Sequence, residues 1–368
     1  MKKIALLGST GSIGVQVLNA VRQHPNSFKV VAMAAYSESK AFTQQIKEFS
    51  PKLYAVASKN RDAALEVAGY EEADIVFNAV SGFAGVEYSV RAIKAGKNLA
   101  LANKETLVCG GEYITRLAKA NGVEIIPVDS EHSAIWQCLE GYVGHGAPAG
   151  LILTCSGGAL REAGAEEIAN ADVERTLRHP TWKMGAKITV DSATLLNKGL
   201  EIIEAHWLFD MPYERISAVI HPESIVHSMV QYADGALLAQ MSYPDMRLPI
   251  QYALSYPKRW PNSLKPLDFA RLGSLSFGAV DEERFPCFRL AKEAGKAGGT
   301  LPAVLSGANE VLVGAFLKGK GPLGLIPRGL EAVLGAHNRG EQTELANIIE
   351  ADRWAREYAG RWLIKQGF

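Results

Sequence analysis

The chain lacks a disulfide framework. Its four cysteines are scattered through 368 residues without a C-x-x-C pair: Cys109, Cys138, Cys155 and Cys287. This scatter argues against a thiolate zinc site and favours reduced thiols, which are typical of the cytoplasm. The sequence also lacks an apolar run of membrane-spanning length, and its first apolar stretch is too short for a signal peptide. We therefore expect a cytoplasmic protein that does not bind a membrane.

An excess of charge of either sign is missing as well. Lys plus Arg and Asp plus Glu both number 39, so the formal net charge is zero. A nucleic-acid-binding protein needs clustered positive charge to neutralise phosphates, and this balance argues against that class. Apolar residues make up 48% of the chain and charged residues 21%, which are ordinary values for a globular protein. The length predicts two or three domains, each with its own core.

Short apolar segments alternate with helical patterns over residues 1–128. The predicted strands occupy residues 3–7, 28–35, 53–57, 75–80, 98–102 and 123–128. Strands that alternate with helices are typical of a parallel, doubly wound sheet. The sequence therefore predicts an α/β protein whose N-terminal domain is Rossmann-like and binds a dinucleotide.

The pattern changes after residue 128. Strand-like segments at 151–154, 218–220, 225–231 and 236–241 are interrupted by one long amphipathic segment, 192–209. We predict a central mixed α/β catalytic domain over 129–255, a linker over 256–283 and a small helical C-terminal domain over 284–368. The linker is predicted from its Pro, Lys and Arg content and weak periodicity.

A glycine-rich loop, Gly8-Ser-Thr-Gly-Ser-Ile-Gly14, lies between the first predicted strand and the following helix. Glycine lets the backbone approach a pyrophosphate, and a helix N-terminus supplies N–H groups for an anion. The G-x-x-G-x-x-G spacing also suits a simple strand-to-helix turn, but the βαβ context favours dinucleotide binding. After the second strand, Ser37 and Lys40 suit the 2′-phosphate of NADP, whereas Glu38 suits the 2′-hydroxyl of NAD. The sequence leaves that choice open.

Polar residues follow two further predicted strands, where ligands of doubly wound sheets gather. Asn103-Lys104-Glu105 follows strand 98–102, with a solvated loop as the alternative. In an extended chain, Asp129 and Glu131 would point the same way after strand 123–128, and such a carboxylate pair favours a cation. Oxygen ligands without Cys or paired His favour Mg²⁺ or Mn²⁺. The alternative for this segment is helix capping, and both roles are compatible.

The segment that begins at Ser192 combines residues that suit a phosphate and a metal. If Ser192 caps the helix, Asn197, Lys198 and Glu201 share one face. Ser, Asn and Lys suit a phosphate, and Glu201 suits a metal. The alternative is an exposed face with a Lys–Glu pair worth ~0.3–0.5 kcal/mol.

Other segments carry weaker signals. The loop Ser156-Gly-Gly offers N–H groups and a hydroxyl to an anion. Residues 178–185 suit a mobile lid, although a connecting loop with Trp182 packed in the core is slightly favoured. For His221 and His227 we expect buried, hydrogen-bonded side chains.

Together these segments resemble the 1-deoxy-D-xylulose 5-phosphate reductoisomerase family over nearly the whole chain. The shared motifs are Gly8-Ser-Thr-Gly-Ser-Ile-Gly, Leu101-Ala-Asn-Lys-Glu, Pro127-Val-Asp-Ser-Glu-His, Ser156-Gly-Gly, Arg178-His-Pro-Thr-Trp-Lys-Met-Gly, Asp191-Ser-Ala-Thr-Leu-Leu-Asn-Lys-Gly-Leu-Glu and Ile220-His-Pro-Glu-Ser-Ile-Val-His-Ser-Met-Val. The resemblance implies that 1-deoxy-D-xylulose 5-phosphate is rearranged in a metal-dependent step and reduced by NADPH to 2-C-methyl-D-erythritol 4-phosphate. This reaction belongs to the non-mevalonate isoprenoid precursor pathway. The family also implies a homodimer.

The resemblance assigns roles residue by residue. It implies that Mg²⁺ or Mn²⁺ is held by Asp129, Glu131 and Glu201. It implies catalytic roles for Lys104, Glu131, His179 and His227. The implied substrate contacts are Lys104, Ser130, Glu131, Ser156, His179, Trp182, Ser192, Asn197, Lys198 and Glu201. The predicted cofactor contacts are Thr10, Gly11, Ser12, Ile13, Asn103, Glu105, Gly185 and Met246, with Ser37 at the second strand.

One departure from the family concerns the cofactor. Many members have a Gly-x-Asn-like turn where this chain has Tyr36-Ser37-Glu38, so the contacts to a 2′-phosphate differ. Two other functions compete. An NAD(P)-dependent dehydrogenase of another phosphorylated polyol would need no metal, and a non-catalytic phosphosugar or dinucleotide sensor would bind without turnover. Three carboxylates that repel one another without a cation argue against the sensor.

Overall fold

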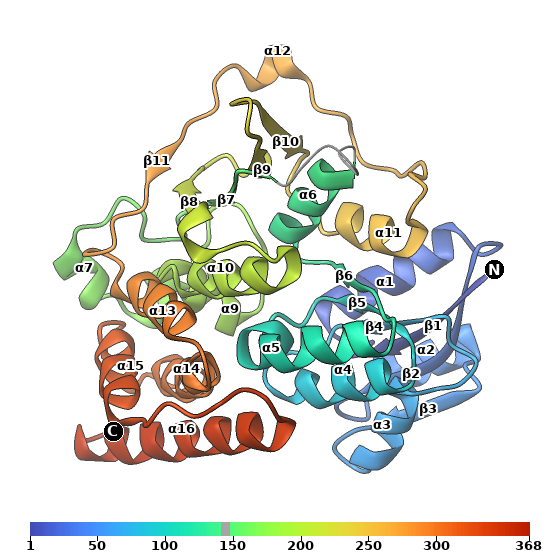
Figure 1. Cartoon of the computed structure of the whole chain (residues 1–368), viewed down its shortest axis with the longest axis horizontal. Helices are drawn as coiled ribbons and strands as arrows, with labels where there is room; N and C mark the ends of the chain where they lie inside the picture. Colours follow the sequence, from blue (N-terminus) through green and yellow to red (C-terminus); the bar gives the residue numbers. More distant parts are fainter. Residues whose placement is uncertain (141–147) are drawn as a thin grey trace. The chain divides into compact units, whose positions relative to one another are not determined.

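The computed structural model describes residues 1–140 and 148–368 (Figure 1). Contacts within the chain separate two compact units, which we call the first unit and the second unit. The first unit comprises Met1–Thr106, Ile114–Ser133 and Asp245–Leu264; the second comprises Leu107–Tyr113, Ala134–Pro244 and Lys265–Phe368. This division differs from the predicted boundaries, because Asp245–Leu264 belongs with the N-terminal domain and the predicted catalytic and helical domains share one unit.

The first unit is built on a six-stranded sheet in which every neighbouring pair is parallel. Its order is β3-β2-β1-β4-β5-β6. The strands are β1 (Lys2–Leu7), β2 (Phe28–Ala35), β3 (Leu53–Val56), β4 (Ile75–Asn78), β5 (Asn98–Leu101) and β6 (Ile125–Pro127). Most side chains of β1, β2, β4 and β5 are buried on both faces, as expected when helices cover a parallel sheet. The predicted doubly wound fold is confirmed.

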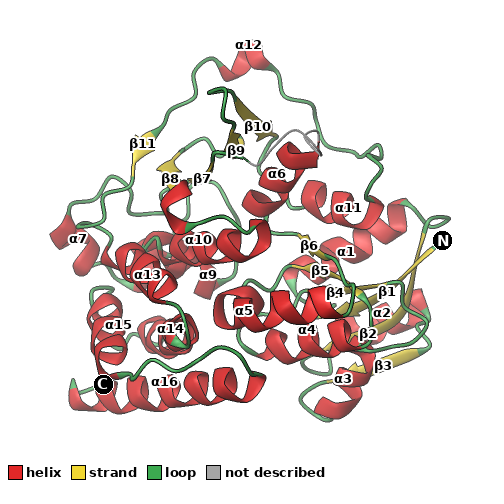
Figure 2. Cartoon of the chain, viewed as in Figure 1, coloured by secondary structure: helices red, strands yellow, loops and turns green. Residues whose placement is uncertain are grey.

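Helices connect these strands, as Figure 2 shows by colour. They are α1 (Ser12–Gln23), α2 (Lys40–Phe49), α3 (Arg61–Ala68), α4 (Ala84–Lys94) and α5 (Glu105–Ala120). The turn between β1 and α1 is tight enough to require glycine. A Cβ at Gly8, whose φ is +79°, would lie 2.6 Å from the carbonyl oxygen of Ala79, and one at Gly14 would lie 2.2 Å from that of Gly8. Glycine is therefore required here by packing before any ligand is considered.

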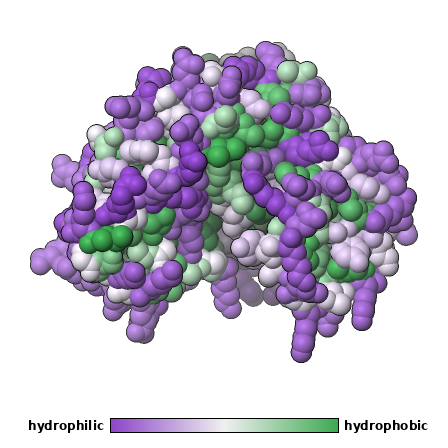
Figure 3. Space-filling view, turned by 90° about the horizontal axis from the view of Figure 1, so that it is seen from below, coloured by the Kyte–Doolittle hydropathy of each residue, from purple (hydrophilic) through white to green (hydrophobic). Residues whose placement is uncertain are grey.

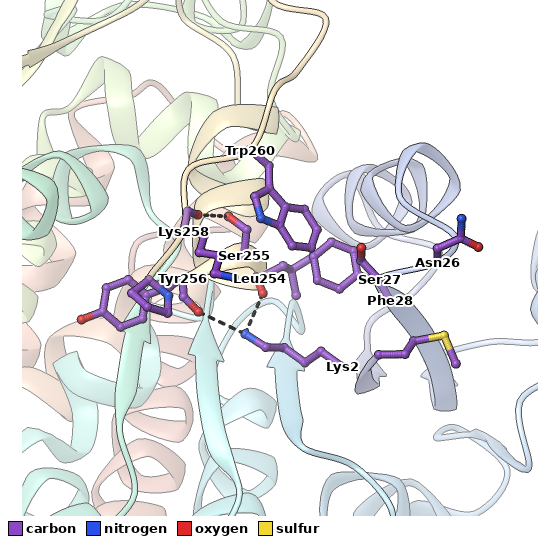
Figure 4. A pocket seen from close by; sticks show the side chains of 11 residues that line it. Lys2, Asn26, Ser27, Phe28, Leu254, Ser255, Tyr256, Lys258 and Trp260 are labelled. Carbon is purple, nitrogen blue, oxygen red and sulfur yellow. Dashed lines mark hydrogen bonds between the residues drawn. The ribbon is translucent and has the colours of Figure 1, made fainter.

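The segment Asp245–Leu264 returns to the first unit through α11 (Arg247–Ser255), which packs against α1. Lys2 Nζ donates to the carbonyl of Leu254 at 2.7 Å, and the Trp260 ring stacks on Phe28 with centroids 5.0 Å apart. Figure 4 shows these side chains around a cavity of about 340 Å³. The ring stack and the half-buried lysine contact tie residues 254–260 to the first unit, so these residues are not a linker.

The second unit contains a five-stranded mixed sheet in the order β10-β9-β7-β8-β11. Its strands are β7 (Gly150–Cys155), β8 (Ile216–Ile220), β9 (Val226–Gln231), β10 (Leu237–Met241) and β11 (Gly278–Ala279). The β7–β8 pair is parallel, and the other pairs are antiparallel. The predicted mixed sheet is confirmed. The predicted linker was wrong at residues 278–279, which add an edge strand to β8.

Helices make up the rest of the second unit. The shorter ones are α6 (Ser130–Leu139, which starts in the first unit), α7 (Ala165–Ala169), α8 (Val173–Thr176), α9 (Ala186–Ala193), α10 (Leu196–Phe209), the 3-10 turn η2 (Tyr213–Arg215) and α12 (Phe269–Leu272). The predicted C-terminal helical region is confirmed as α13 (Pro286–Ala297), α14 (Leu301–Leu317), α15 (Leu325–Ala336) and α16 (Leu345–Lys365). Helix α14 is mostly buried because the other three pack against it.

No helix among the described residues combines the length and apolarity needed to cross a membrane. On the face drawn in Figure 3, hydrophilic residues cover much of the surface and apolar residues form smaller patches.

The long segment predicted over 192–209 is two helices rather than one. Helix α9 ends at Ala193, and α10 begins at Leu196, because Leu195 adopts a left-handed φ of +56°. Ser192 therefore lies in the last turn of α9 and does not cap the helix that carries Glu201.

Candidate active site

In the first unit, the glycine-rich loop leads from β1 directly into α1. The helix begins at Ser12, and its N-cap is Gly11, which has no side chain to occupy the helix N-terminus. The buried Gln45 side chain holds the loop by donating from Nε2 to the Ser9 carbonyl at 3.0 Å. An open N-terminus of a 12-residue helix, approached closely by backbone, fits a dinucleotide pyrophosphate.

The segment Asn103-Lys104-Glu105 is buried, with exposed fractions of 1%, 8% and 7%, so the solvated-loop alternative is wrong. The Asn103 amide donates to the carbonyls of Val80 and Gly82 at 2.8 and 2.9 Å and to Glu105 Oε2 at 2.9 Å. Its oxygen accepts hydrogen bonds from Thr106. The Asn103 side chain therefore holds together the loops that follow β4 and β5, at the sheet edge where a cofactor is expected.

Lys104 and Asp129 form an ion pair across the ends of β5 and β6, with Nζ 2.8 Å from Oδ2. Burial alone would raise the pKa of Asp129. The charge of Lys104, the neighbouring His132 and hydrogen bonds from Lys104 and Glu131 outweigh burial and hold this pKa well below its usual range. Asp129 is therefore an anionic carboxylate with a positive partner at the carboxyl edge of the sheet.

Asp129 and Glu131 converge for a different reason from the one predicted. Ser130 is already the first residue of α6, so the chain is not extended here. Ligand oxygens of the two carboxylates nevertheless lie within 4.8 Å of each other. The Ser130 hydroxyl donates to Glu131, and the Asp129 carbonyl accepts from Ser133 N at 2.8 Å. The segment thus starts the helix and also offers two hard oxygen ligands that fit Mg²⁺ or Mn²⁺.

In the second unit, the Ser156-Gly-Gly loop packs against the end of α9. Gly157 and Gly158 have φ values of +81° and +69°. A Cβ at Gly158 would lie 2.5 Å from the carbonyl oxygen of Ser192 and 2.8 Å from Cα of Ala193. Two glycines in left-handed conformations therefore bring the predicted anion loop against Ser192, a second residue predicted to bind phosphate.

The loop 178–185 is tied to Ser156 through His179. Nδ1 of His179 accepts hydrogen bonds from the backbone N–H groups of Thr181 and Trp182 at 3.2 and 2.9 Å. The ring proton therefore sits on Nε2, which donates to Ser156 Oγ at 3.0 Å. Burial, aided by the charge of Arg161, lowers the pKa of His179. The neutral ring thus links the loop to Ser156, which is predicted to bind an anion.

Trp182 is only partly buried, so the interpretation that it packs in the core is wrong. Its ring lies 6.2 Å from the ring of His227 in an edge-on arrangement. His227 is buried, and its Nε2 lies 2.9 Å from Ser242 Oγ. Burial lowers the pKa of His227 to about 4, so its ring is neutral. The Trp182 ring therefore lies beside an uncharged surface.

His221 has the structural role expected of it. It is fully buried; Nε2 accepts from the backbone N–H groups of Ile225 and Val226 at 3.1 Å each, and Nδ1 donates to the Ser276 carbonyl at 2.8 Å. These bonds hold the turn between β8 and β9.

Asn197, Lys198 and Glu201 share one face of α10, as the spacing predicts. The Asn197 amide and the Lys198 ammonium both donate to the Glu201 carboxylate. The side chains of Lys198 and Glu201 are 3% and 2% exposed, so the exposed-face alternative is wrong. A buried lysine beside an amide suits an anion, and the buried Glu201 carboxylate suits a hard cation.

Two predicted cofactor contacts lie in different units. Met246 immediately precedes α11 in the first unit, and Gly185 is the N-cap of α9 in the second. Ser37 follows the end of β2 in the first unit.

Known proteins match this chain over its whole length. Models of the 1-deoxy-D-xylulose 5-phosphate reductoisomerase match residues 4–67 and 59–111, its C-terminal domain model matches 125–209, and a DXP reductoisomerase C-terminal domain matches 241–358. The 1-deoxy-D-xylulose 5-phosphate reductoisomerase of Gloeobacter violaceus is 50% identical, over 100% of this chain and 98% of the relative. That of Chlorobium phaeobacteroides is 48% identical over 98% of each chain.

The chain belongs to the 1-deoxy-D-xylulose 5-phosphate reductoisomerase family.

A solved structure of a family member supports the same assignment. The crystal structure of DOX-P reductoisomerase in complex with NADPH, fosmidomycin and magnesium superposes with a TM-score of 0.92 at 37% identity and covers 99% of this chain and 98% of its own. The reductoisomerase from Zymomonas mobilis in complex with NADPH gives a TM-score of 0.90 at 36% identity, covering 98% of this chain and 99% of its own.

Two contacts beside the Ser156 and Ser192 segments were missed by sequence reasoning. Arg161 donates from Nη1 to the Ser156 carbonyl at 3.3 Å, beside His179. Asp191, one residue before Ser192, accepts from Asn309 Nδ2 at 2.8 Å and pairs with Lys187 at 2.8 Å. Arg161 stands in a segment without a recognisable motif, and Asn309 lies 118 residues from Asp191. Neither contact leaves a signal in local spacing.

Proposed function

We propose that this protein converts 1-deoxy-D-xylulose 5-phosphate to 2-C-methyl-D-erythritol 4-phosphate, with NADPH as reductant and Mg²⁺ or Mn²⁺ as the metal. The observation that carries the proposal is 50% identity over the full length with a 1-deoxy-D-xylulose 5-phosphate reductoisomerase. The polar residues proposed to bind metal, substrate and cofactor are all present in this chain. A solved relative holds NADPH, fosmidomycin and magnesium, which fits this cofactor and metal.

The metal is assigned to the carboxylates of Asp129, Glu131 and Glu201. When bound, the ion supplies Lewis-acid stabilisation for negative charge on the substrate oxygens. Lys104, held by Asp129, adds a positive charge where the substrate hydroxyls bind. Ser130 is assigned to hydrogen-bond the substrate chain. These groups would act while a carbon–carbon bond is broken and re-formed.

The substrate phosphate is assigned to Ser156, Ser192, Asn197 and Lys198. Support comes from the Ser156 loop packing on Ser192 and from the buried Lys198 ammonium. Binding energy from the phosphate can orient the reacting carbons. His179 and Trp182 are assigned to cover the substrate and exclude water, and His227 lies beside Trp182.

NADPH is assigned to its contacts residue by residue. The pyrophosphate would bind at the N-terminus of α1, where Thr10, Gly11, Ser12 and Ile13 lie. The other proposed contacts are Ser37, Asn103, Glu105, Gly185 and Met246.

The finer expectations on assembly and compartment also belong to this proposal. A homodimer is supported by the edge strand β10, where Leu237 and Leu238 are 51% and 37% exposed. A cytoplasmic enzyme is supported by the cysteines, all four of which are described, buried and outside any disulfide.

An assay of NADPH consumption with 1-deoxy-D-xylulose 5-phosphate tests the proposal. Wild-type protein should oxidise NADPH with Mg²⁺ or Mn²⁺ present and stop when a chelator is added. Glu201→Gln should lower kcat by at least about 100-fold while leaving the Kd for NADPH nearly unchanged. Metal-independent turnover would favour a simple polyol-phosphate dehydrogenase, and binding without turnover would favour a sensor.

A further inference from the structure

At the end of β2 the sequence offers one cation for the 2′-phosphate of NADPH, Lys40, which is the first residue of α2. The chain has Tyr36-Ser37-Glu38 there, and an acidic residue at this place normally accepts a hydrogen bond from the 2′-hydroxyl of NAD. Ser39 is engaged as the N-cap of α2, because its Oγ accepts from Phe42 N at 3.1 Å. Because Glu38 is acidic, a second positive charge at this place would strengthen the binding of a 2′-phosphate.

The structure brings Lys59 to this place. The parallel pairing of β2 with β3 continues past both strands: Ala57 N donates to the Ala35 carbonyl and Ser58 N to the Tyr36 carbonyl, each at 2.9 Å. The next residue, Lys59, lies in the turn after β3, and its ammonium pairs with the Glu38 carboxylate. Both strands end at the same edge of the sheet, where the adenosine ribose of a dinucleotide is expected.

The backbone of this turn is well held. Lys59 N and Asn60 N both donate to the Val56 carbonyl at 3.0 Å, and the Asn60 side chain caps α3 by accepting from Ala63 N at 3.0 Å. The side chains of Lys59 and Glu38, by contrast, are 65% and 63% exposed and have room to change conformation. An exposed ion pair of this kind costs little to break.

We propose that Lys59 binds the 2′-phosphate of NADPH and that Glu38 holds the lysine in place until the cofactor arrives. The inference rests on the proposed function only in taking NADPH as the cofactor. A phosphate monoester carries more negative charge than one carboxylate, so it displaces Glu38 from the lysine. Ser37, one residue before Glu38, can donate its hydroxyl to the same phosphate. NADH lacks this phosphate and leaves the Lys59–Glu38 pair intact.

Two nucleotides that differ only at the 2′-position test the proposal without turnover. We would titrate 2′,5′-ADP and 5′-AMP into the wild-type protein, Lys59→Ala and Glu38→Gln by calorimetry. In Lys59→Ala the Kd for 2′,5′-ADP should rise about ten-fold, while the Kd for 5′-AMP stays unchanged. In Glu38→Gln the Kd for 2′,5′-ADP should fall about two- to five-fold, because the competing carboxylate is gone.

Lys52→Ala is the matched control. Lys52 is also an exposed lysine paired with a glutamate, Glu72, at 2.7 Å, but it lies just before β3 at the opposite end of the strand. This variant should bind both nucleotides like the wild type. The ratio of kcat/KM for NADPH to kcat/KM for NADH should follow the binding data. It should fall in Lys59→Ala, rise in Glu38→Gln and stay unchanged in Lys52→Ala.

The outcomes separate this inference from the proposed function. An unchanged Kd ratio in Lys59→Ala overturns the role of Lys59. Weaker 5′-AMP binding in Glu38→Gln, with 2′,5′-ADP unaffected, would show that Glu38 contacts the 2′-hydroxyl and would also overturn it. If the wild-type protein turned over neither cofactor, the proposed function would fail, and the calorimetric comparison would still decide the role of Lys59.

Discussion

The ring of His179 donates from Nε2 to Ser156 Oγ at 3.0 Å while its Nδ1 accepts two backbone hydrogen bonds from the loop that follows it. One neutral side chain thus fixes both the loop 178–185 and a serine proposed to bind phosphate. Removing the ring should affect substrate binding and loop order together.

Acidification should loosen this loop. Burial and the charge of Arg161 lower the pKa of His179 below its usual value of 6.5. The open or unfolded loop therefore takes up a proton first. The neutral ring stabilises the closed loop fully at pH values above the ordinary histidine pKa of 6.5. This stabilisation is lost as the pH falls through the lowered pKa that His179 has in the folded protein. Protonation of Nδ1 also removes the acceptor for Thr181 and Trp182.

Limited proteolysis measures this effect. Cleavage within 178–185 should be faster at about pH 5.5 than at about pH 7.5 in the wild-type protein, because the ordinary histidine pKa of 6.5 lies between these values and the opened loop takes up a proton there. In His179→Asn, whose side chain can accept a hydrogen bond at any pH, the rate should change little. The same pH dependence in both proteins would contradict the explanation.

Gly158→Ala should weaken substrate binding. The residue has φ +69°, and a Cβ would lie 2.5 Å from the Ser192 carbonyl, so the loop must move away from α9. We expect a loss of about 1–3 kcal/mol in unfolding free energy and a KM for the phosphosugar at least about five-fold higher. Denaturant titration and steady-state kinetics provide the two values.

Gly235→Ala separates strain from the steric clash. Gly235 has φ +87°, but a Cβ added there would meet no described atom within 4 Å, so only the backbone strain remains. This control should lose a similar strain energy and keep the wild-type KM. A raised KM in both variants would argue that general destabilisation, not the contact with Ser192, causes the effect.

Asn309→Ala should destabilise the second unit and raise KM. The Asn309 amide donates to the buried Asp191, which precedes Ser192 in α9, so its loss leaves a buried carboxylate oxygen without this donor. We expect about 1–3 kcal/mol lower unfolding free energy, measured by denaturant titration. Arg361→Ala, which removes an exposed pair with Glu357, should change stability by less than about 0.5 kcal/mol. Equal losses in the two variants would contradict a special role for Asn309.

Several features of the site and of the fold could be predicted only in part from the sequence. The proximity of Asp129 and Glu131 was predicted from an extended chain, but it arises where β6 turns into α6. The break at Leu195 was not predicted, because leucine favours helices and nothing local marks its left-handed conformation. The edge strand β11 was hidden in a segment with little periodicity and forms only because β8 is there to pair with it.

The sequence by itself determined the order of strands and helices in the first unit and the placement of polar residues after the strands. Those features depend on local spacing and on apolar runs such as Ile75–Asn78, which need burial on both faces whatever their partners. Only the tertiary structure decided that Lys59 pairs with Glu38, that Asn309 holds Asp191 and that His179 is neutral. These three features depend on contacts between segments well separated along the chain and on burial from water. The spacing of neighbouring residues encodes neither the contacts nor the burial.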